Sequence, residues 1–172
     1  SLKGDVRPQN EDAHKVVINI DGKDSSINNI NFFSIFDGHG GKQVSKYLEK
    51  NLPKYFVSKQ VQYPLSKKYV INVYDHLQTN LLENKFAHRS GSTGLVVINF
   101  DHNNAKFLSV INNGDCRCVL CRDNFAIPLT KDHKPHCPEE YYRIKDLGGK
   151  IRYDGYDWRI GDLSVSRAFG DL

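Results

Sequence analysis

A carboxylate, an imidazole and three glycines occupy the five consecutive positions from Asp37 to Gly41. They directly follow Phe32–Phe36, an apolar run of strand length that is typical of a strand buried on both faces. One interpretation is a plain strand-to-helix turn, with glycine at positive φ and Asp37 capping the helix. Such a turn needs no histidine and fewer glycines. A carboxylate beside unshielded peptide oxygens suits a hard cation, so the stretch predicts a cation site.

The neighbouring elements should bring further carboxylates to this point. We expect strands at 16–20 and 31–36. If they pair as an antiparallel hairpin, Asp12 lies opposite Asp37, with Glu11 beside it. Three carboxylates at one strand end repel one another unless a cation lies among them. The alternative is that all of them turn outward into solvent, which is the commoner fate of acidic side chains.

The rest of the chain predicts an α+β fold. No strand–helix–strand repeat runs through it, so we expect antiparallel sheets with helices packed outside. Arg89–Gly94 and the polar segment Asp21–Asn29 are expected to be loops. Helices are expected at 42–56, 66–86 and 138–147, and strands at 95–100, 106–111, 116–121, 125–129, 151–153 and 156–160.

Length and charge exclude several classes of function. The chain has 172 residues and a formal net charge of +4, and no basic run is interleaved with aromatic residues. A nucleic-acid partner is therefore not expected. The longest apolar runs are only strand-sized, so no membrane-spanning segment is expected. Ser1–Gly4 does not resemble a signal peptide, and we expect a reducing, intracellular compartment.

The four cysteines raise the question of zinc. Cys116, Cys118 and Cys121 lie close together, and Cys137 is near two histidines. If 116–121 is a strand, Cys121 points to the opposite face from Cys116 and Cys118, and one tetrahedral metal cannot easily gather them. We therefore interpret these cysteines as small apolar side chains, and we expect neither zinc nor a disulfide.

Six segments, in this order along the chain, resemble the motifs of the type 2C protein phosphatases, which are metal-dependent serine/threonine phosphatases. Singly each motif is weak, but together they cover the chain essentially from end to end. The segments are Asn10–His14, Phe36–Gly41, Arg89–Thr93, Asn113–Arg117, Lys131–Pro135 and Leu163–Asp171.

The resemblance implies a fold and an activity. The fold is a four-layer α/β/β/α sandwich of two mainly antiparallel sheets with flanking helices. Residues 1–172 would be a single domain, the N-terminal part of the catalytic domain. The activity is hydrolysis of phosphoserine and phosphothreonine in protein substrates, by attack of a water that bridges two Mn²⁺ or Mg²⁺ ions. A monomer in the cytoplasm or nucleus is expected.

The resemblance also implies roles for the acidic residues. Asp37 matches the carboxylate that bridges the two ions, and Gly38 matches a residue that offers its backbone carbonyl. Glu11 matches a ligand of one ion, directly or through water, and Asp12 matches an outer-shell residue. Asp115 matches an acidic residue linked to a weaker third metal position. Ligands that are all oxygen atoms select hard cations such as Mn²⁺ and Mg²⁺.

Two further residues would act on the substrate. Arg7 matches the arginine that grips the phosphate, which a guanidinium fork fits well. His39 matches the general acid that protonates the leaving oxygen. The family carries two more metal-binding aspartates beyond the segment that ends here at Leu172, and we interpret Asp154–Asp157 and Asp123-Asn124 as coincidental likenesses to their motifs. The alternative to an active phosphatase is therefore a catalytically incomplete, phosphatase-like binding or scaffold module.

Overall fold

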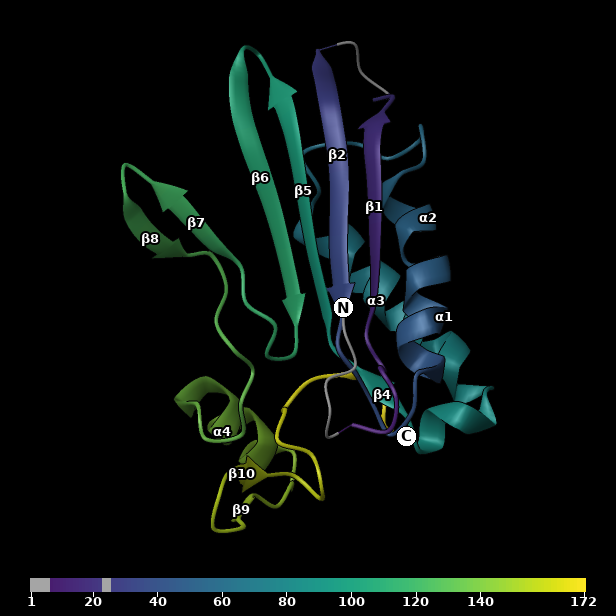
Figure 1. Cartoon of the computed structure of the whole chain (residues 1–172), viewed down its shortest axis with the longest axis vertical. Coiled ribbons are helices and arrows are strands. Elements are labelled where there is room, and N and C mark those ends of the chain that lie inside the picture. The colour runs from purple at the N-terminus through teal and green to yellow at the C-terminus, as the bar shows by residue number, and fades with distance from the viewer. Residues whose placement is uncertain (1–6, 23–25) are drawn as a thin grey trace.

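A four-stranded antiparallel sheet is the largest element of the fold. The structure is a computed structural model that describes residues 7–22 and 26–172, so Ser1–Gly4 and part of the expected loop at 21–29 lie outside the described residues. The strand order is β1-β2-β5-β6 (Figure 1). The strands are β1 (Ala13–Ile20), β2 (Ile27–Phe36), β5 (Gly94–His102) and β6 (Ala105–Asn113).

The register of the first hairpin confirms the predicted pairing. Ala13 pairs with Phe36, and the pairing continues to Val17 and Phe32 before a β-bulge. Asp12 and Asp37 are the next residues beyond the Ala13–Phe36 pair, so both follow the sheet at the same end. Because side chains alternate between faces along each strand, this register also decides which apolar residues face the helices.

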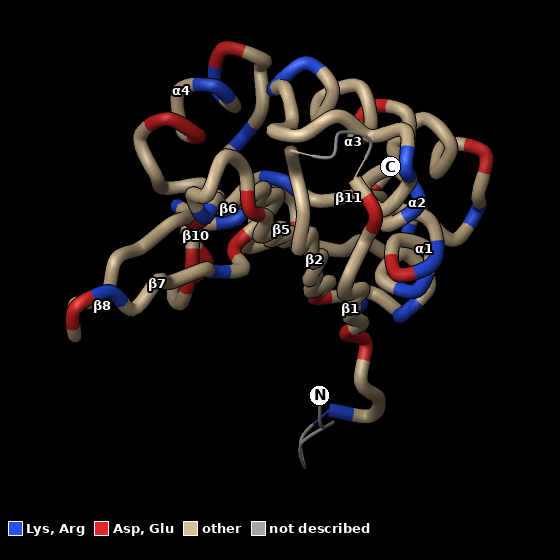
Figure 2. Tube along the Cα trace, turned by 90° about the horizontal axis from the view of Figure 1, so that it is seen from above, with Lys and Arg blue, Asp and Glu red and all other residues tan. Residues whose placement is uncertain are grey.

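Helices cover one face of the sheet (Figure 2). Ser66 begins the longest helix by accepting a hydrogen bond at its Oγ from the Tyr69 N–H, at 3.1 Å. The single helix predicted at 42–56 is divided in two, because Pro53 starts a new short helix. The elements are α1 (Gln43–Asn51), α2 (Pro53–Phe56), α3 (Lys67–Leu82) and the 3₁₀ helix η1 (Lys85–His88).

Burial along β2 alternates. Phe32 and Phe36 are fully buried against the helices, whereas Phe33 and Ile35 on the other face are 40% and 51% exposed. The prediction that Phe32–Phe36 is buried on both faces is therefore wrong for the described residues. These residues contain one sheet face packed on helices and one open apolar face, where the expected sandwich would place its second sheet. The mixed α/β class with antiparallel sheets and packed helices is confirmed.

Smaller elements follow the large sheet. The strand predicted at 116–121 begins only at Val119, so Cys116 and Cys118 precede it. Gly114, at φ 115°, turns the chain sharply before this segment. Among the described helices, none is long and apolar enough to cross a membrane. The elements are β7 (Val119–Arg122), β8 (Phe125–Pro128), α4 (Pro138–Asp146), β9 (Arg152–Tyr153) and β10 (Trp158–Arg159).

Three strands of two residues each form a separate small sheet below the large one. The order is β11 (Phe169–Gly170), β4 (Gly91–Ser92), β3 (Gly38–His39), and both pairings are antiparallel. The loop predicted at Arg89–Gly94 thus contains a strand. His39 and Gly170 both pair with Gly91, so this sheet brings the segment near residue 170 beside His39.

Candidate active site

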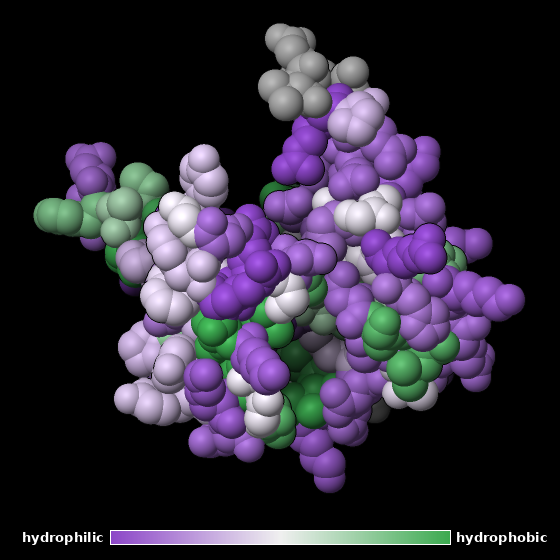
Figure 3. Space-filling view, turned by 90° about the horizontal axis from the view of Figure 1, so that it is seen from below, coloured by the Kyte–Doolittle hydropathy of each residue, from purple (hydrophilic) through white to green (hydrophobic). Residues whose placement is uncertain are grey.

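A cavity of about 340 Å³ lies at the end of the large sheet. Seen from below, this end of the molecule is largely hydrophilic around a hollow that shows some hydrophobic residues (Figure 3). The cavity brings together all of the site residues predicted from the sequence, which come from three separate segments. They are Arg7, Glu11, Asp12, Asp37, Gly38, His39 and Asp115.

Thr93 fixes the backbone at Asp37. The Asp37 N–H donates to Thr93 Oγ1 at 3.0 Å, and the Thr93 N–H donates to the Asp37 carbonyl at 2.9 Å. These bonds involve only the main chain of Asp37, and Asp37 lines the cavity. Loss of hydration raises the pKa of Asp37, and the nearby negative charges of Asp12 and Asp115 raise it further. Ionisation of Asp37 is therefore less favourable here than in water, although the nearby charges of His39 and Arg7 offset part of this effect.

Gly38 is required by a close backbone approach. A Cβ at this position would collide with the backbone oxygen of Glu11 and would lie 2.9 Å from Ser45 Oγ. The Ser45 hydroxyl donates a short hydrogen bond to the same Glu11 oxygen. The segment before β1 is therefore pinned against β3, which places Glu11 and Asp12 at the cavity. The resemblance explains glycine at this position by an exposed carbonyl, and the close approach of the Glu11 oxygen is a second reason for it.

His39 is held by a partner that sequence reasoning did not include among the site residues. His39 Nε2 lies 2.7 Å from Asp171 Oδ2, and the two side chains are 28% and 19% exposed. The hydrogen bond to Asp171 raises the pKa of His39, against the opposing effect of burial. A Cβ on Gly91 would collide with both side chains, so the small sheet leaves room for this pair. The imidazole is thus poised to carry a proton.

We expect the His39 titration to depend on Asp171. In metal-free protein, NMR should give His39 a midpoint above its ordinary 6.5, and Asp171→Asn should lower that midpoint. Because the folded-state pKa is raised, the pair stabilises the fold fully below pH 6.5 and loses this contribution as pH rises through the folded midpoint. An unchanged midpoint in Asp171→Asn would contradict this assignment.

The cavity also contains side chains that sequence reasoning missed. Arg159 and Asp162 line it from the segment that follows β9. Arg159 forms a short ion pair with Asp154, and its Nη1 donates to the Asp162 carbonyl at 2.8 Å. The acidic stretch interpreted as coincidental thus fixes one wall of the cavity. No short motif could have indicated that Arg159 lines the cavity, because its contacts with Asp154 and Asp162 form only when the hairpin folds back.

The carboxylates share the cavity without forming a closed ligand set. Among the described residues, no group of three or more His, Cys, Asp or Glu side chains is placed to hold one metal ion. Glu11 accepts a hydrogen bond from Gln9 at 3.3 Å, and Asp115 pairs with Lys134 at 2.6 Å. Mutual repulsion gives each carboxylate a reason to take such a partner. The donor atoms are all oxygens, and the raised pKa of Asp37 fits a residue that a cation would stabilise.

The fold and the cavity define a class of protein: an α/β domain that presents an acidic, oxygen-rich pocket with a paired imidazole at the end of its sheet. The chain belongs to the protein phosphatase 2C family, because the family profile described as "Protein phosphatase 2C" matches residues 3–172. This family is metal-dependent, and the resemblance inferred from the six motifs is confirmed.

Two plant proteins illustrate the relationship. The chain is 37% identical over 175 residues to "Probable protein phosphatase 2C 27" of Oryza sativa subsp. japonica, covering 94% of this chain and 46% of that protein. It is 36% identical over 155 residues to "Probable protein phosphatase 2C 71" of Arabidopsis thaliana, covering 88% of this chain and 33% of that protein. The chain therefore spans a third to about half of these relatives.

Solved structures share the fold. One is described as "Crystal structure of a phosphatase from a pathogenic strain Toxoplasma gondii". It superposes with a TM-score of 0.77 at 24% identity, covering 96% of this chain and 61% of that one. The likeness extends over nearly all of the present chain, so the sheet, the helices and the small sheet described above belong to a known architecture.

Proposed function

We propose that the protein containing this chain is a protein serine/threonine phosphatase that hydrolyses phosphoserine and phosphothreonine with the help of Mn²⁺ or Mg²⁺. Residues 1–172 would contribute one part of a single catalytic domain. The observation that carries the proposal is that Arg7, which only the resemblance links to the site, lines the same cavity as Asp37 and His39 in a member of this family. Phosphorylated proteins would be the substrates.

Each residue of the cavity has a distinct task in this proposal. Arg7 binds the phosphate of the substrate and orients it. His39, held by Asp171, delivers a proton to the serine or threonine oxygen as the ester bond breaks. The Asp171 carboxylate keeps the imidazole in one orientation and favours its protonated form. Thr93 has a structural role, because it fixes the backbone at Asp37.

Asp37, the Gly38 carbonyl and Glu11 would hold the cations, with Asp12 in the outer shell and Asp115 at a weaker third position. Bound divalent cations supply an activated water and neutralise charge on the phosphoryl oxygens. The close contact between Gly38 and Glu11 would bring the oxygen ligands of these cations together at one strand end. The fold also leaves Asp37 with a destabilising negative charge that positive charge would relieve.

Metal removal is the first test. The purified protein with Mn²⁺ should release phosphate from a phosphothreonine peptide. Excess EDTA should reduce release to the buffer background, and added Mn²⁺ or Mg²⁺ should restore it, because bound cations would activate the attacking water. Malachite-green detection of phosphate measures all three states. Release that persists unchanged in EDTA would overturn the metal-dependent mechanism.

The alternative is a phosphatase-like module that binds phosphorylated proteins without turnover. The observation that favours it is that the described carboxylates do not form a complete ligand set. Fluorescence anisotropy with a phosphothreonine peptide distinguishes the two proposals. Binding that requires Arg7 but is accompanied by no phosphate release, at any Mn²⁺ concentration, would support the module.

A further inference from the structure

The ammonium group of Lys134 lies at the edge of the cavity and forms an ion pair with one of the carboxylates that line it. Lys134 Nζ is 2.6 Å from Asp115 Oδ2 and 3.9 Å from Asp157 Oδ2. The three side chains are only 21%, 23% and 34% exposed, so water screens their interactions incompletely. Asp115 is also one of the cavity residues whose charge acts on Asp37. Lys134 therefore supplies positive charge to the same cluster that would attract a metal ion.

The backbone around Lys134 holds this ammonium in place. The His133 N–H donates to the Gly114 carbonyl at 3.0 Å, and the Gly114 N–H donates to His133 Nδ1 at 3.1 Å. The Ser166 N–H adds a hydrogen bond to the His133 carbonyl at 2.9 Å. The residues before Lys134 and Asp115 are thus fastened directly to each other. Their ion pair is a built part of the fold, unlike a contact between two flexible surface side chains.

A divalent cation at Asp115 would meet this ammonium at close range. Both are positive, and both seek the same carboxylate oxygen, so each disfavours the other. Asp157 offers Lys134 a second carboxylate at 3.9 Å, toward which the ammonium can turn when Asp115 is engaged elsewhere. Lys134 would therefore compete with a metal ion for Asp115, and Asp157 gives its ammonium group an alternative partner.

We propose that Lys134 is a positioning residue that sets the affinity of Asp115 for a divalent cation, by occupying Asp115 when no cation is bound. This inference rests on the proposed function, because it requires Asp115 to face a metal ion. It extends that function by giving a physical reason why a third metal position would be weak: Lys134 already neutralises the carboxylate there. Occupation of this position then depends on the free concentration of the cation.

Mn²⁺ binding to purified protein, measured by isothermal titration calorimetry and by the loss of the free Mn²⁺ electron paramagnetic resonance signal, tests the inference. Lys134→Met should bind Mn²⁺ at its weakest site about tenfold more tightly than wild type, because the competing charge is removed. Lys134→Arg keeps the charge and should bind as wild type does. Adding Asp115→Asn to Lys134→Met should abolish the gain.

Lys131→Met is the matched control. Lys131 lies in the same loop, but its ion pair with Glu139 is 83% and 79% exposed, so its removal should leave Mn²⁺ affinity unchanged. Far-ultraviolet circular dichroism establishes that each variant is folded, and Lys134→Gln replaces Lys134→Met if the latter is not. Equal Mn²⁺ affinity in wild type and the folded neutral variant overturns the inference while leaving the proposed function intact. Absence of any Mn²⁺ binding and any phosphate release in wild type overturns the proposed function itself.

Discussion

Asp37→Asn should reduce phosphate release from a phosphothreonine peptide by about a thousandfold or more, because one substitution removes the central negative charge of the cavity. Asparagine keeps the size of the side chain and the backbone bonds to Thr93, which involve only the main chain of Asp37. The loss should therefore appear in activity and in Mn²⁺ affinity, and not in the fold. Phosphate release at saturating Mn²⁺, together with calorimetric Mn²⁺ titration, measures both effects.

The same substitution should preserve or increase stability in metal-free protein. The raised pKa of Asp37 means that its ionised form is less favourable in the folded than in the unfolded state, so stability falls as pH rises through the titration of this group. A neutral amide removes that penalty at neutral pH. Asp123→Asn, in the turn between β7 and β8 and outside the cavity lining, is the control and should alter neither activity nor Mn²⁺ affinity. An Asp37→Asn protein as active as wild type would refute the assigned role.

The first hairpin explains why much of the site could be predicted from the sequence. The positions of the two apolar runs and of the polar segment between them limit its register, and this register places Asp12 next to Asp37. The motif around Asp37 then gathers a carboxylate, an imidazole and a glycine within a few positions. Features of this kind can be predicted because they depend on residues that are close together in the sequence.

Other parts of the site depend on contacts between distant segments. The small sheet β11-β4-β3 has strands of two residues, four of its six positions being glycine or serine, so no alternation indicates it. It nevertheless joins His39 to Asp171, which are 132 positions apart. The ion pair between Lys134 and Asp115 is similarly invisible in sequence. Charged residues are common on surfaces, and only the fold decides which of them meet.

The continuous apolar run Phe32–Phe36 shows how a correct pattern can lead to a wrong burial prediction. Both faces of β2 are apolar, as a doubly buried strand would be. In the described residues, however, helices cover only the side that holds Phe32 and Phe36, while Ile35 remains 51% exposed. The residue types thus reflect a strand suited to burial on both sides, and the described part of the chain supplies a cover for only one of them.

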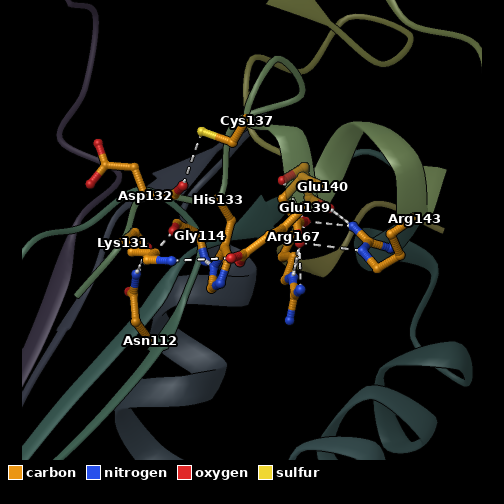
Figure 4. A network of polar contacts seen from close by, with 11 residues as sticks. Asn112, Gly114, Lys131, Asp132, His133, Cys137, Glu139, Glu140, Arg143 and Arg167 are labelled. Carbon is orange, nitrogen blue, oxygen red and sulfur yellow. Dashed lines mark hydrogen bonds and ion pairs between the residues drawn. The ribbon is translucent and has the colours of Figure 1, made fainter. Parts of the chain in front are cut away.

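Glu140 is the buried carboxylate with the largest expected effect on stability. Glu140 is 3% exposed, and its carboxylate accepts hydrogen bonds from Arg143 at 2.7 Å, from Ser166 at 2.7 Å and, at shorter range, from Arg167. Figure 4 shows Arg143 and Arg167 beside Glu140. Burial by itself would raise the pKa of Glu140, but the bonds from Arg167, Arg143 and Ser166 outweigh it and lower the pKa to about 2. The network joins α4 to the segment before β11, whose residues Ser164 and Val165 line the cavity.

Glu140→Gln should lower the free energy of unfolding by about 2–3 kcal/mol, because it leaves two guanidinium groups without their shared counter-charge. This is less than for a fully buried pair, since the side chains of Arg143 and Arg167 are 38% and 43% exposed and water partly compensates them. Urea denaturation followed by circular dichroism measures the change. Glu139→Gln is the matched control: its exposed carboxylate forms an ion pair with Lys131 in which both side chains are about four-fifths exposed, so little change is expected.

The difference between wild type and Glu140→Gln should depend on pH in a defined direction. A carboxylate whose pKa is lowered on folding stabilises the protein above its ordinary pKa of 4.5, and this contribution disappears as pH falls toward about 2. The two proteins should therefore differ most at neutral pH and converge in acid. A difference that stays constant from pH 7 to pH 3 would indicate that Glu140 acts through packing alone, and that its charge does not hold the cavity wall in place.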